Sequence, residues 1–253
     1  QKNQKIKIEE INFSGNLNIK SSKLKKMMKN TRETGIRYIF SASKFIRNEY
    51  TEDLNQIITL YQSKGFRDVI IKKDSLYISS KGNLILDIEI EEGSKYYFGD
   101  ISWLGNKKYD SQKLSTMLGI NKGDVFDSQR LDERLNMSRN GDDISALYMD
   151  DGYLFFQINP IEISIQDTKH INLELQISEG KQATIKNVTV EGNSKTNDRI
   201  IMREVRSLPG SLFKRSDIIR TQEEFNRLGF FNPETLGVNP IPDPNTGDVD
   251  IHY

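Results

Sequence analysis

The side chains that most often carry chemistry are scarce in this chain of 253 residues and are poorly placed for catalysis. There is no cysteine, which excludes thiolate nucleophiles, disulfides and cysteine metal sites. The two histidines, His170 and His252, lie in strand-like segments and lack the paired spacing of a zinc motif. No glycine-rich phosphate loop or G-x-S-x-G elbow occurs either. The sequence therefore predicts neither an enzyme nor a cofactor.

Two acidic pairs, Asp142-Asp143 and Asp150-Asp151, are the remaining candidates for metal binding. They lack the alternating ligand spacing of a calcium loop, so solvated helix ends are the favoured interpretation, and no metal site is expected. Lys and Arg number 36 and so do Asp and Glu, and this balance predicts no nucleic-acid partner. No apolar run approaches the roughly 18 residues of a membrane helix. The chain opens on Gln1 without a signal-peptide pattern, which indicates a processed or truncated form.

A strand that runs into Gly-Asn occurs three times, as "INFSGN", "ISWLGN" and "VTVEGN". Apolar residues alternate before each turn, which is the pattern of a half-buried strand. Both residue types of the pair tolerate positive φ, so the chain is expected to turn sharply there. These expected turns are Gly15, Asn16, Gly105, Asn106, Gly192 and Asn193.

A second junction, glycine followed by an aromatic residue, also occurs three times, at Gly65, Gly152 and Gly229. A helical pattern precedes each one, most clearly where Leu54, Ile57, Ile58 and Tyr61 are spaced i, i+3, i+4, i+7. The glycine is expected to end the helix in a left-handed conformation, and the aromatic residue to begin a strand and pack back on the helix.

The order of elements is therefore strand, helix, helix, strand, strand, repeated over residues 1–94, 95–180 and 181–253. Such a repeat is an α+β unit, with two helices packed on one face of a three-stranded mixed sheet.

The ends of several helices can also be predicted from single residues. Ser21 or Ser22 and Ser111 are the expected N-caps of the first helices in the first two repeats. Gly119 is the expected stop of the first helix in the second repeat. Asn140-Gly141 is expected to break the second helix of that repeat.

The three tandem repeats resemble polypeptide-transport-associated (POTRA) domains. The segment "LFKRSDIIRTQEEFNRLGFFNPETLGVNPIPDPNTGDVDIHY" is similar to the last POTRA domain before the membrane barrel of outer-membrane protein assembly factors. The segments "KFIRNEYTEDLNQIITLYQSKGFRD" and "LYMDDGYLFFQINP" are similar to the two preceding domains. Such proteins usually carry five of these domains, so the repeats would be the third, fourth and fifth, the last one truncated in its final strand.

The resemblance implies a periplasmic scaffold that is tethered to the outer membrane through a C-terminal barrel and is monomeric as this fragment. It would receive unfolded outer-membrane proteins and dock accessory lipoproteins, without catalysis or a cofactor. Two alternatives stay open: the POTRA region of a related secretion or translocation transporter, and a structural envelope spacer that binds no client. Secretion transporters typically carry two repeats, whereas this chain shows three.

Backbone pairing would explain how one surface receives many clients. A sheet edge presents unpaired N–H and C=O groups to an added strand, and the resulting backbone pairing depends little on the sequence of that strand. In POTRA domains the exposed edge is usually the second strand. The expected client-binding residues are Val69, Ile70, Ile71, Lys72, Phe155, Phe156, Gln157 and Ile158. In the third repeat the corresponding segment is 236–238, whose edge would be blunted by Pro240, Pro242 and Pro244.

A basic stripe is the candidate surface for partner docking. Arg199, Arg203 and Arg206 are spaced i, i+4, i+7 on an expected helix of the third repeat and could pair with carboxylates of a partner. A solvated helix face, with Glu204 and Glu223 nearby, is the favoured alternative. The same ambiguity holds for a lysine-rich helix at 20–29, and the sequence allows but does not require contact with anionic lipid.

Overall fold

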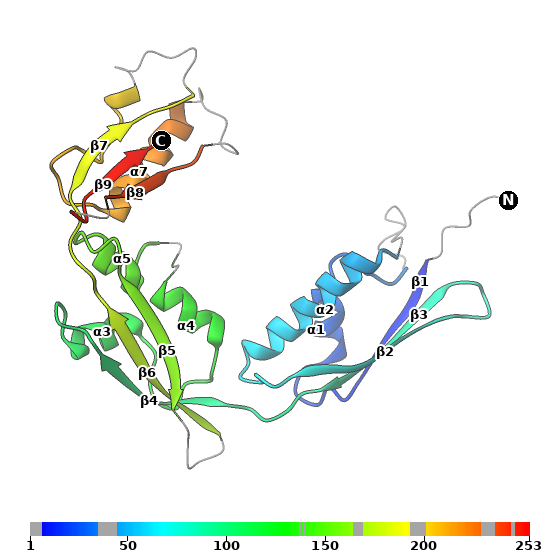
Figure 1. The fold of residues 1–253 in the computed structure, drawn as a ribbon. Helices are drawn as coiled ribbons and strands as arrows, with labels where there is room; N and C mark the ends of the chain where they lie inside the picture. The colour runs from blue at the N-terminus through cyan, green and yellow to red at the C-terminus, as the bar shows by residue number, and fades with distance from the viewer. Residues whose placement is uncertain are drawn as a thin grey trace. The chain divides into compact units, whose positions relative to one another are not determined.

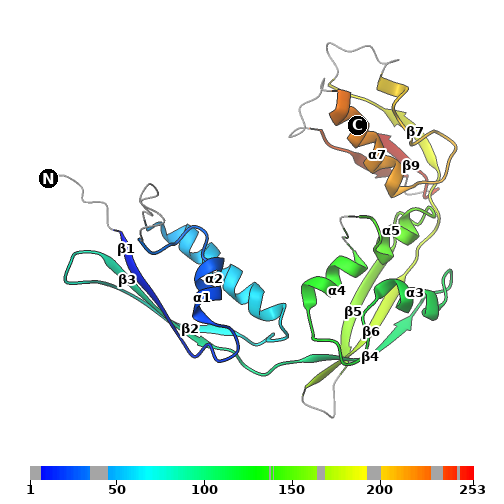
Figure 2. The same cartoon turned by 180° about the vertical axis from the view of Figure 1, so that it is seen from behind.

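The computed structural model contains three sheets of three strands each, and helices accompany every sheet (Figures 1 and 2). In each sheet the last strand of the repeat lies in the middle, so the orders are β1-β3-β2, β4-β6-β5 and β7-β9-β8. The predicted α+β class is confirmed. The structure describes residues 7–34, 45–136, 138, 140–163, 169–192, 201–228, 236–243 and 246–253. Within these ranges, no helix combines the length and apolarity needed to cross a membrane.

The first repeat has its core between the helices and one face of the sheet. The central strand runs parallel to the first strand and antiparallel to the second. Its alternate residues, from Leu84 to Ile90, are buried, and so are Tyr50, Ile57 and Tyr61 on the long helix. The predicted helix spacing is therefore confirmed. The elements are β1 (Ile8–Ser14), α1 (Ser21–Met27), α2 (Arg47–Gln62), β2 (Ile70–Ile78) and β3 (Leu84–Glu91).

The second repeat carries one helix more than expected, because its second helix is split. The break predicted at Asn140-Gly141 is confirmed: Gly141 has a φ of 68°, which a side chain would disfavour. Asp143 then starts the next helix, and its carboxylate accepts the Ala146 N–H at 2.7 Å. The elements are β4 (Tyr97–Leu104), α3 (Ser111–Leu118), α4 (Ser128–Leu135), α5 (Ile144–Met149), β5 (Gln157–Ile163) and β6 (His170–Ser178).

The third repeat is built in the same way around Phe225, which is fully buried against Tyr253 with ring centroids 5.4 Å apart. Its central strand contributes Val249 and Ile251 to the same core. The elements are β7 (Ile185–Thr189), α7 (Arg215–Leu228), β8 (Asn239–Pro242) and β9 (Val249–His252).

The glycines of the Gly-Asn turns adopt positive φ, but Asn16 and Asn106 do not. Gly15, Gly105 and Gly192 have φ of 77°, 90° and 82°, whereas no described residue other than glycine is positive. Glycine alone supplies the positive φ of the turn, and the asparagine side chain has a different use. Asn16 donates to the Ile19 carbonyl (2.8 Å) and the Ser21 hydroxyl (3.0 Å), and Asn106 makes the matching bonds to Tyr109 and Ser111. Asn193 and Gly229 lie outside the described residues.

The expected serine N-caps were wrong by one or two residues. The helix α1 is preceded by Lys20 without a side-chain cap, because the Ser21 hydroxyl accepts from Asn16 instead. The helix α3 is capped by Asp110, whose carboxylate accepts the Lys113 N–H at 2.8 Å. The predicted stop at Gly119 is confirmed, with a left-handed φ of 62°.

A tyrosine and a glutamate join the layers of the first two repeats. The hydroxyl of Tyr61 in α2 donates to Glu92 at 2.8 Å, and Glu92 also accepts the backbone N–H of Asn18 after the Gly-Asn turn. In the second repeat the hydroxyl of Tyr148 donates to Glu179 at 3.1 Å, and Glu179 accepts from the loop after that repeat's turn. Glu92 and Glu179, each followed by a glycine at the end of its repeat, thus fix both the helix and the turn.

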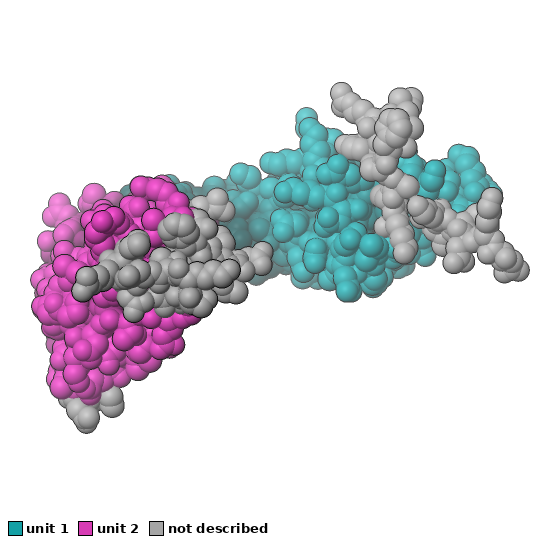
Figure 3. Space-filling view, turned by 90° about the horizontal axis from the view of Figure 1, so that it is seen from above, with its two compact units in different colours: residues 1–99, 121–130, 164–172 teal, residues 100–120, 131–163, 173–253 magenta. Residues whose placement is uncertain are grey.

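The chain divides into two compact units, which are coloured separately in Figure 3. Unit 1 contains residues 1–99, 121–130 and 164–172, and unit 2 contains residues 100–120, 131–163 and 173–253. The second repeat therefore contributes to both.

Within each unit the helix-stop glycine is hydrogen-bonded to the start of the following repeat. In unit 1 the Tyr96 N–H donates to the Gly65 carbonyl at 2.8 Å, and the Phe126 N–H donates to the Tyr96 carbonyl at 3.0 Å. In unit 2 Ala183 donates to Gly152 and Phe213 to Ala183, at 2.8 and 2.9 Å. Corresponding positions are offset by the same number of residues, so this backbone relay is part of the repeat.

Side chains reinforce the relay in unit 1. The Arg67 guanidinium lies 5.7 Å from the ring centroids of both Tyr96 and Phe126. The Tyr96 hydroxyl donates to Asp68 at 2.6 Å. The aromatic residue after the glycine packs back on its helix as predicted, since the rings of Phe66 and Tyr61 meet edge to face with centroids 5.8 Å apart.

A β-bulge early in the first strand distinguishes the repeats from one another. The bulged residue of β1 is Glu9, and its carboxylate pairs with Lys81 at 2.9 Å in the β2–β3 turn. The bulged residue of β7 is Lys186, which pairs with Asp243 at 3.4 Å after β8. The second repeat has Gly99 at this place, where a side chain would collide with the amide of Asn172. This position is thus occupied by an acidic residue in the first repeat, by glycine in the second and by a basic residue in the third.

Gly65→Ala is expected to loosen the relay in unit 1. Gly65 has a φ of 92°, and an added Cβ would lie 2.8 Å from the Tyr96 carbonyl oxygen. We expect hydrogen exchange at the Tyr96 N–H to accelerate by about tenfold or more, because strain and overpacking together cost roughly 2–4 kcal/mol. Gly82→Ala is the matched control, since Gly82 has a φ of 78° and open space around it. Equal effects of the two substitutions on the Tyr96 N–H would contradict the relay.

Candidate functional site

Each sheet has two edges, and the chain closes the first-strand edge with its own connector. In the first repeat the Thr34 N–H donates to the Ile8 carbonyl, and Glu33 accepts the Ile11 N–H, both at 2.8 Å. In the second repeat Phe98 exchanges backbone bonds of 2.8 Å with residues 123–124. In the third repeat Ile185 does the same with residues 210–211. An added strand could pair with the first residues of these edges only by displacing the connector.

The second strands β2, β5 and β8 are the other edges, as predicted. Among the described residues, β2 pairs with β3 and with no other strand. Its outer side is therefore available for pairing.

Only part of the predicted segment lies on the regular stretch of an edge strand in the first repeat. The strand β2 begins at Ile70 and continues to Ile78, while Val69 is buried in the preceding turn, where its N–H donates to Phe66. Lys72 is a bulge, since the register with β3 passes from Ile71 directly to Lys73. A bulge interrupts an edge. The regular edge is thus 73–78, and it ends in the exposed side chains of Tyr77 and Ile78.

In the second repeat too, only part of the predicted segment lies in the edge strand. The strand β5 begins at Gln157, and Phe156 is buried before it, stacked on Tyr148 with centroids 4.1 Å apart. Phe155 precedes the strand too, whereas Gln157 and Ile158 belong to it. Pro160 lies inside the strand and has no N–H to donate.

The edge of the third repeat is short and rich in proline. The strand β8 covers Asn239–Pro242 instead of the expected 236–238, and Pro240 and Pro242 are two of its four residues. Pro244 lies outside the described residues. The number of prolines therefore rises from none in β2 to one in β5 and two in β8.

The arginine stripe does not lie on one helix as expected. The helical residues described in this region end at Met202, so Arg203 falls in a turn and Arg206 in the irregular segment after it. Both are exposed, and Arg203 is 3.4 Å from Glu204. The Arg206 N–H donates to the Thr221 hydroxyl at 2.9 Å, which fixes the backbone there. Arg199 lies outside the described residues.

The lysine-rich segment at 20–29 forms only the short helix α1. Lys25 pairs with Glu33 at 2.6 Å, while Lys20, Lys23, Lys26 and Lys29 are exposed. The acidic pairs have structural uses: Asp143 is fully buried and paired with Arg215, and Asp151 pairs with Lys108 at 2.8 Å. Across the described ranges, no group of three or more His, Asp or Glu side chains could hold a metal ion.

Comparison with known proteins places the three repeats in a family. The family model described as "POTRA: Surface antigen variable number repeat" matches residues 6–93, 96–180 and 183–253. The chain is 24% identical over 250 residues to the outer membrane protein assembly factor BamA of Neisseria meningitidis, covering 97% of this chain and 30% of that protein. It is also 24% identical over 258 residues to BamA of Nitratidesulfovibrio vulgaris, covering 99% of this chain and 31% of that protein.

A solved structure has the same fold. The crystal structure of Haemophilus influenzae BamA POTRA3-5 matches with a TM-score of 0.74 at 21% identity, and the match covers 98% of this chain and 95% of that one. The chain spans about a third of the length of the two curated relatives. The sequence-based recognition of three consecutive POTRA repeats like those of BamA is confirmed.

The contact between Glu9 and the β2–β3 turn gives a measurable pH dependence. Hydrogen bonds from Lys81, then Ser79 and Asn83, hold the pKa of Glu9 at about 2, below its usual 4.5. Because this pKa is lowered on folding, the contact stabilises the folded state above pH 4.5 and loses its effect as the pH falls toward 2. Carboxyl NMR titration of Glu9 should show the low midpoint, and Lys81→Met should raise it. Lys73→Met is the control, and an unchanged midpoint in Lys81→Met would refute the contact.

Proposed function

The chain belongs to the POTRA family throughout its three repeats, and from this membership we propose that it is a periplasmic scaffold of an outer-membrane protein assembly machinery. In the proposed arrangement a C-terminal barrel tethers it to the outer membrane, unfolded outer-membrane proteins are its clients, and accessory lipoproteins dock on it. The names of the relatives support the assembly role. The observation that carries the client role is the unpaired outer edge of β2.

The proposed mechanism is strand addition to that edge. Clients of such a machinery become β-strands in the end, and a backbone ladder accepts such strands with little regard to their sequence. The edge of β2 over residues 73–78 has no proline and a regular register, so it can offer each of its outward N–H and C=O groups. The exposed Tyr77 and Ile78 side chains would add apolar contact to a client strand.

The three edges should differ in strength because proline removes donors from a ladder. We propose that the β2 edge is the main client site, that the β5 edge is weaker because of Pro160, and that the β8 edge is closed by Pro240 and Pro242. Backbone pairing at β2 uses no charged side chain, which suits clients of varied composition.

An outer-membrane β-strand peptide added to the isotope-labelled chain is expected to shift the backbone amide resonances of residues 73–78. Shifts should be smaller at 157–163 and absent at 239–242, in the order of the proline content. The control peptide has the same sequence with alternate amides N-methylated, which removes the donors along one side. Saturation without shifts at 73–78, or equal shifts with the methylated peptide, would reject strand addition and favour a spacer role.

We also propose that Arg203 and Arg206 dock an acidic accessory lipoprotein, since both are exposed next to the fixed backbone at Thr221. In the full-length protein, Arg203→Glu with Arg206→Glu should lower lipoprotein affinity by about tenfold, because each lost ion pair is replaced by repulsion. Affinity purification from the native envelope would measure it. Arg227→Glu, an exposed site on α7, is the control. Equal retention of lipoproteins by the variant and the control would exclude this surface.

A further inference from the structure

The chain that follows β1 carries charges of one sign only. No Asp or Glu occurs in residues 11–32. Residues 17–29, here called the lysine segment, comprise the turn after β1 and the helix α1 (Figure 1). Its exposed cations are Lys20, Lys23, Lys26 and Lys29. Lys23 and Lys26 are three residues apart in α1, so their side chains are neighbours on its surface.

The carboxylates that contact the lysine segment leave these four lysines without a partner. Glu33 pairs with Lys25, the remaining lysine, at 2.6 Å. Glu92 and Asp53 are buried, and they accept N–H groups of the turn and of residues 30–31. Among the described residues, none of the four exposed lysines has an ion pair. Their charge is therefore available to an external anion.

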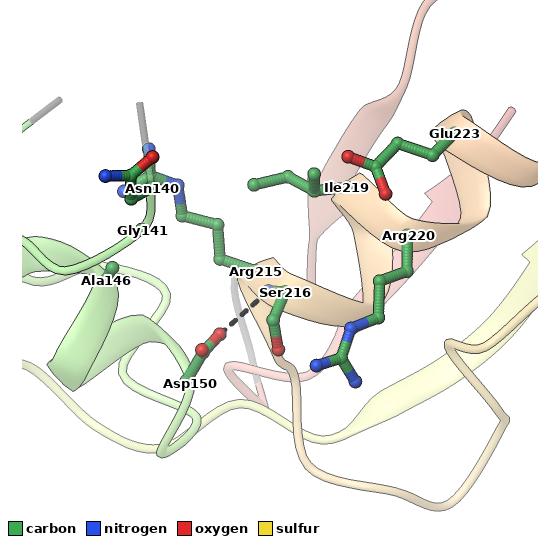
Figure 4. Close-up of a pocket in the computed structure, with 9 residues that line it drawn as sticks. All are labelled: Asn140, Gly141, Ala146, Asp150, Arg215, Ser216, Ile219, Arg220 and Glu223. Atoms are coloured by element: carbon green, nitrogen blue, oxygen red, sulfur yellow. Dashed lines mark hydrogen bonds between the residues drawn. The ribbon is translucent and has the colours of Figure 1, made fainter. Parts of the chain in front are cut away.

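The cleft beside α7 shows the contrast. It is lined by two basic residues, Arg215 and Arg220, and by two acidic ones, Asp150 and Glu223 (Figure 4). These charges balance, so the cleft favours neither an anionic nor a cationic partner. The lysine segment, with its single sign, favours an anionic one.

An exposed leucine begins the lysine segment. Leu17 is 92% exposed, whereas Ile78, the next most exposed large apolar side chain of the described chain, is 64% exposed. The residues on either side hold the turn in place. The Asn16 side chain donates to a carbonyl of the turn at 2.8 Å, and the Asn18 side chain donates to Glu92 at 2.6 Å. The turn therefore presents Leu17 to solvent in a fixed position.

Two properties of this surface favour a lipid bilayer over an acidic protein. Its cations are all lysines, which are depleted in protein interfaces, whereas arginine is enriched there. Clusters of four or more basic residues are typical of contacts with anionic headgroups, which need no fixed pairing. The Cα atoms of Leu17 and Lys20 lie at most about 11 Å apart, because three residues of extended chain reach no further. An apolar tip beside cations is the arrangement that binds a membrane interface.

We infer that the lysine segment binds the surface of a bilayer that contains anionic phospholipid. Leu17 enters the headgroup region, and the four exposed lysines pair with the phosphates. The contact is a reversible attachment of the first repeat to a membrane. It uses neither a sheet edge nor Arg203 and Arg206, so its failure would leave the proposed function standing.

The test is co-sedimentation of the whole chain with phospholipid vesicles at low salt. We expect binding to vesicles of phosphatidylcholine and phosphatidylglycerol in equal parts, and none to vesicles of phosphatidylcholine alone. Binding should weaken as the salt concentration rises, because salt screens exposed charges. In the isotope-labelled chain, the amide signals of residues 17–29 should broaden when the anionic vesicles are added.

Lysine variants locate the contact. Lys20→Gln, Lys23→Gln and Lys26→Gln combined should lower the affinity for anionic vesicles by about tenfold or more. The control removes the same charge from exposed lysines elsewhere, by Lys64→Gln, Lys181→Gln and Lys214→Gln. It should bind nearly as the wild type does.

Leu17→Ser should lower the affinity by about threefold or more, because it removes the apolar contact. Leu208→Ser, at a site that is 57% exposed, is the control. Amide spectra of the free variants will show that the fold is kept. The inference is overturned if neutral vesicles bind equally, or if the two triple variants bind alike. It is also overturned if anionic vesicles do not bind, which would leave an acidic protein as the partner.

Discussion

Backbone groups at sheet edges must find partners, and this requirement organises the whole chain. A three-stranded sheet leaves two rows of N–H and C=O groups unpaired. In each repeat the connector after the first helix takes up the first-strand edge near its start, as at Phe98 and Ile185. In the second and third repeats the connector also ends in the phenylalanine, Phe126 or Phe213, that closes the relay from the preceding repeat. The start of one edge is therefore used to join repeats, while β2 at the other edge pairs, among the described residues, with no strand but β3.

The glycine that ends the helix has two structural roles, because it both reverses the chain and provides a backbone acceptor for the next repeat. A left-handed φ at Gly65 or Gly152 ends the helix, and the carbonyl of that glycine then accepts the first N–H of the next repeat. A side chain at Gly65 would intrude on the Tyr96 carbonyl. The recurrence of glycine before an aromatic residue is thus explained by chain reversal and by close approach together. The aromatic residue stabilises the reversal by packing on its own helix.

The sequence patterns correctly predicted those features of the fold that depend on local periodicity. The buried faces of α2 and β3, the helix stops and the break at Gly141 all follow from spacing and from glycine. The start of β2 did not, because Val69 is as apolar as a strand residue yet is buried in a turn. The bulge at Lys72 adds one residue to an alternation and leaves no signature in composition. The pairing of Asp143 with Arg215 joins residues 72 positions apart, which no local pattern can reveal.

The bulge on the first strand has a consequence for how tandem copies find their own parts during folding. Similar repeats in one chain can exchange hairpins, and misassembly between neighbouring copies is a known hazard of such proteins. If the hairpin of the third repeat met the first strand of the first, Asp243 would face Glu9; in the reverse exchange Lys81 would face Lys186. Gly99 admits no charged side chain beside Asn172 at all. The three copies of one architecture therefore differ in charge at this position. In the first and third repeats, the charge on the hairpin is opposite to the charge on the first strand of the same repeat.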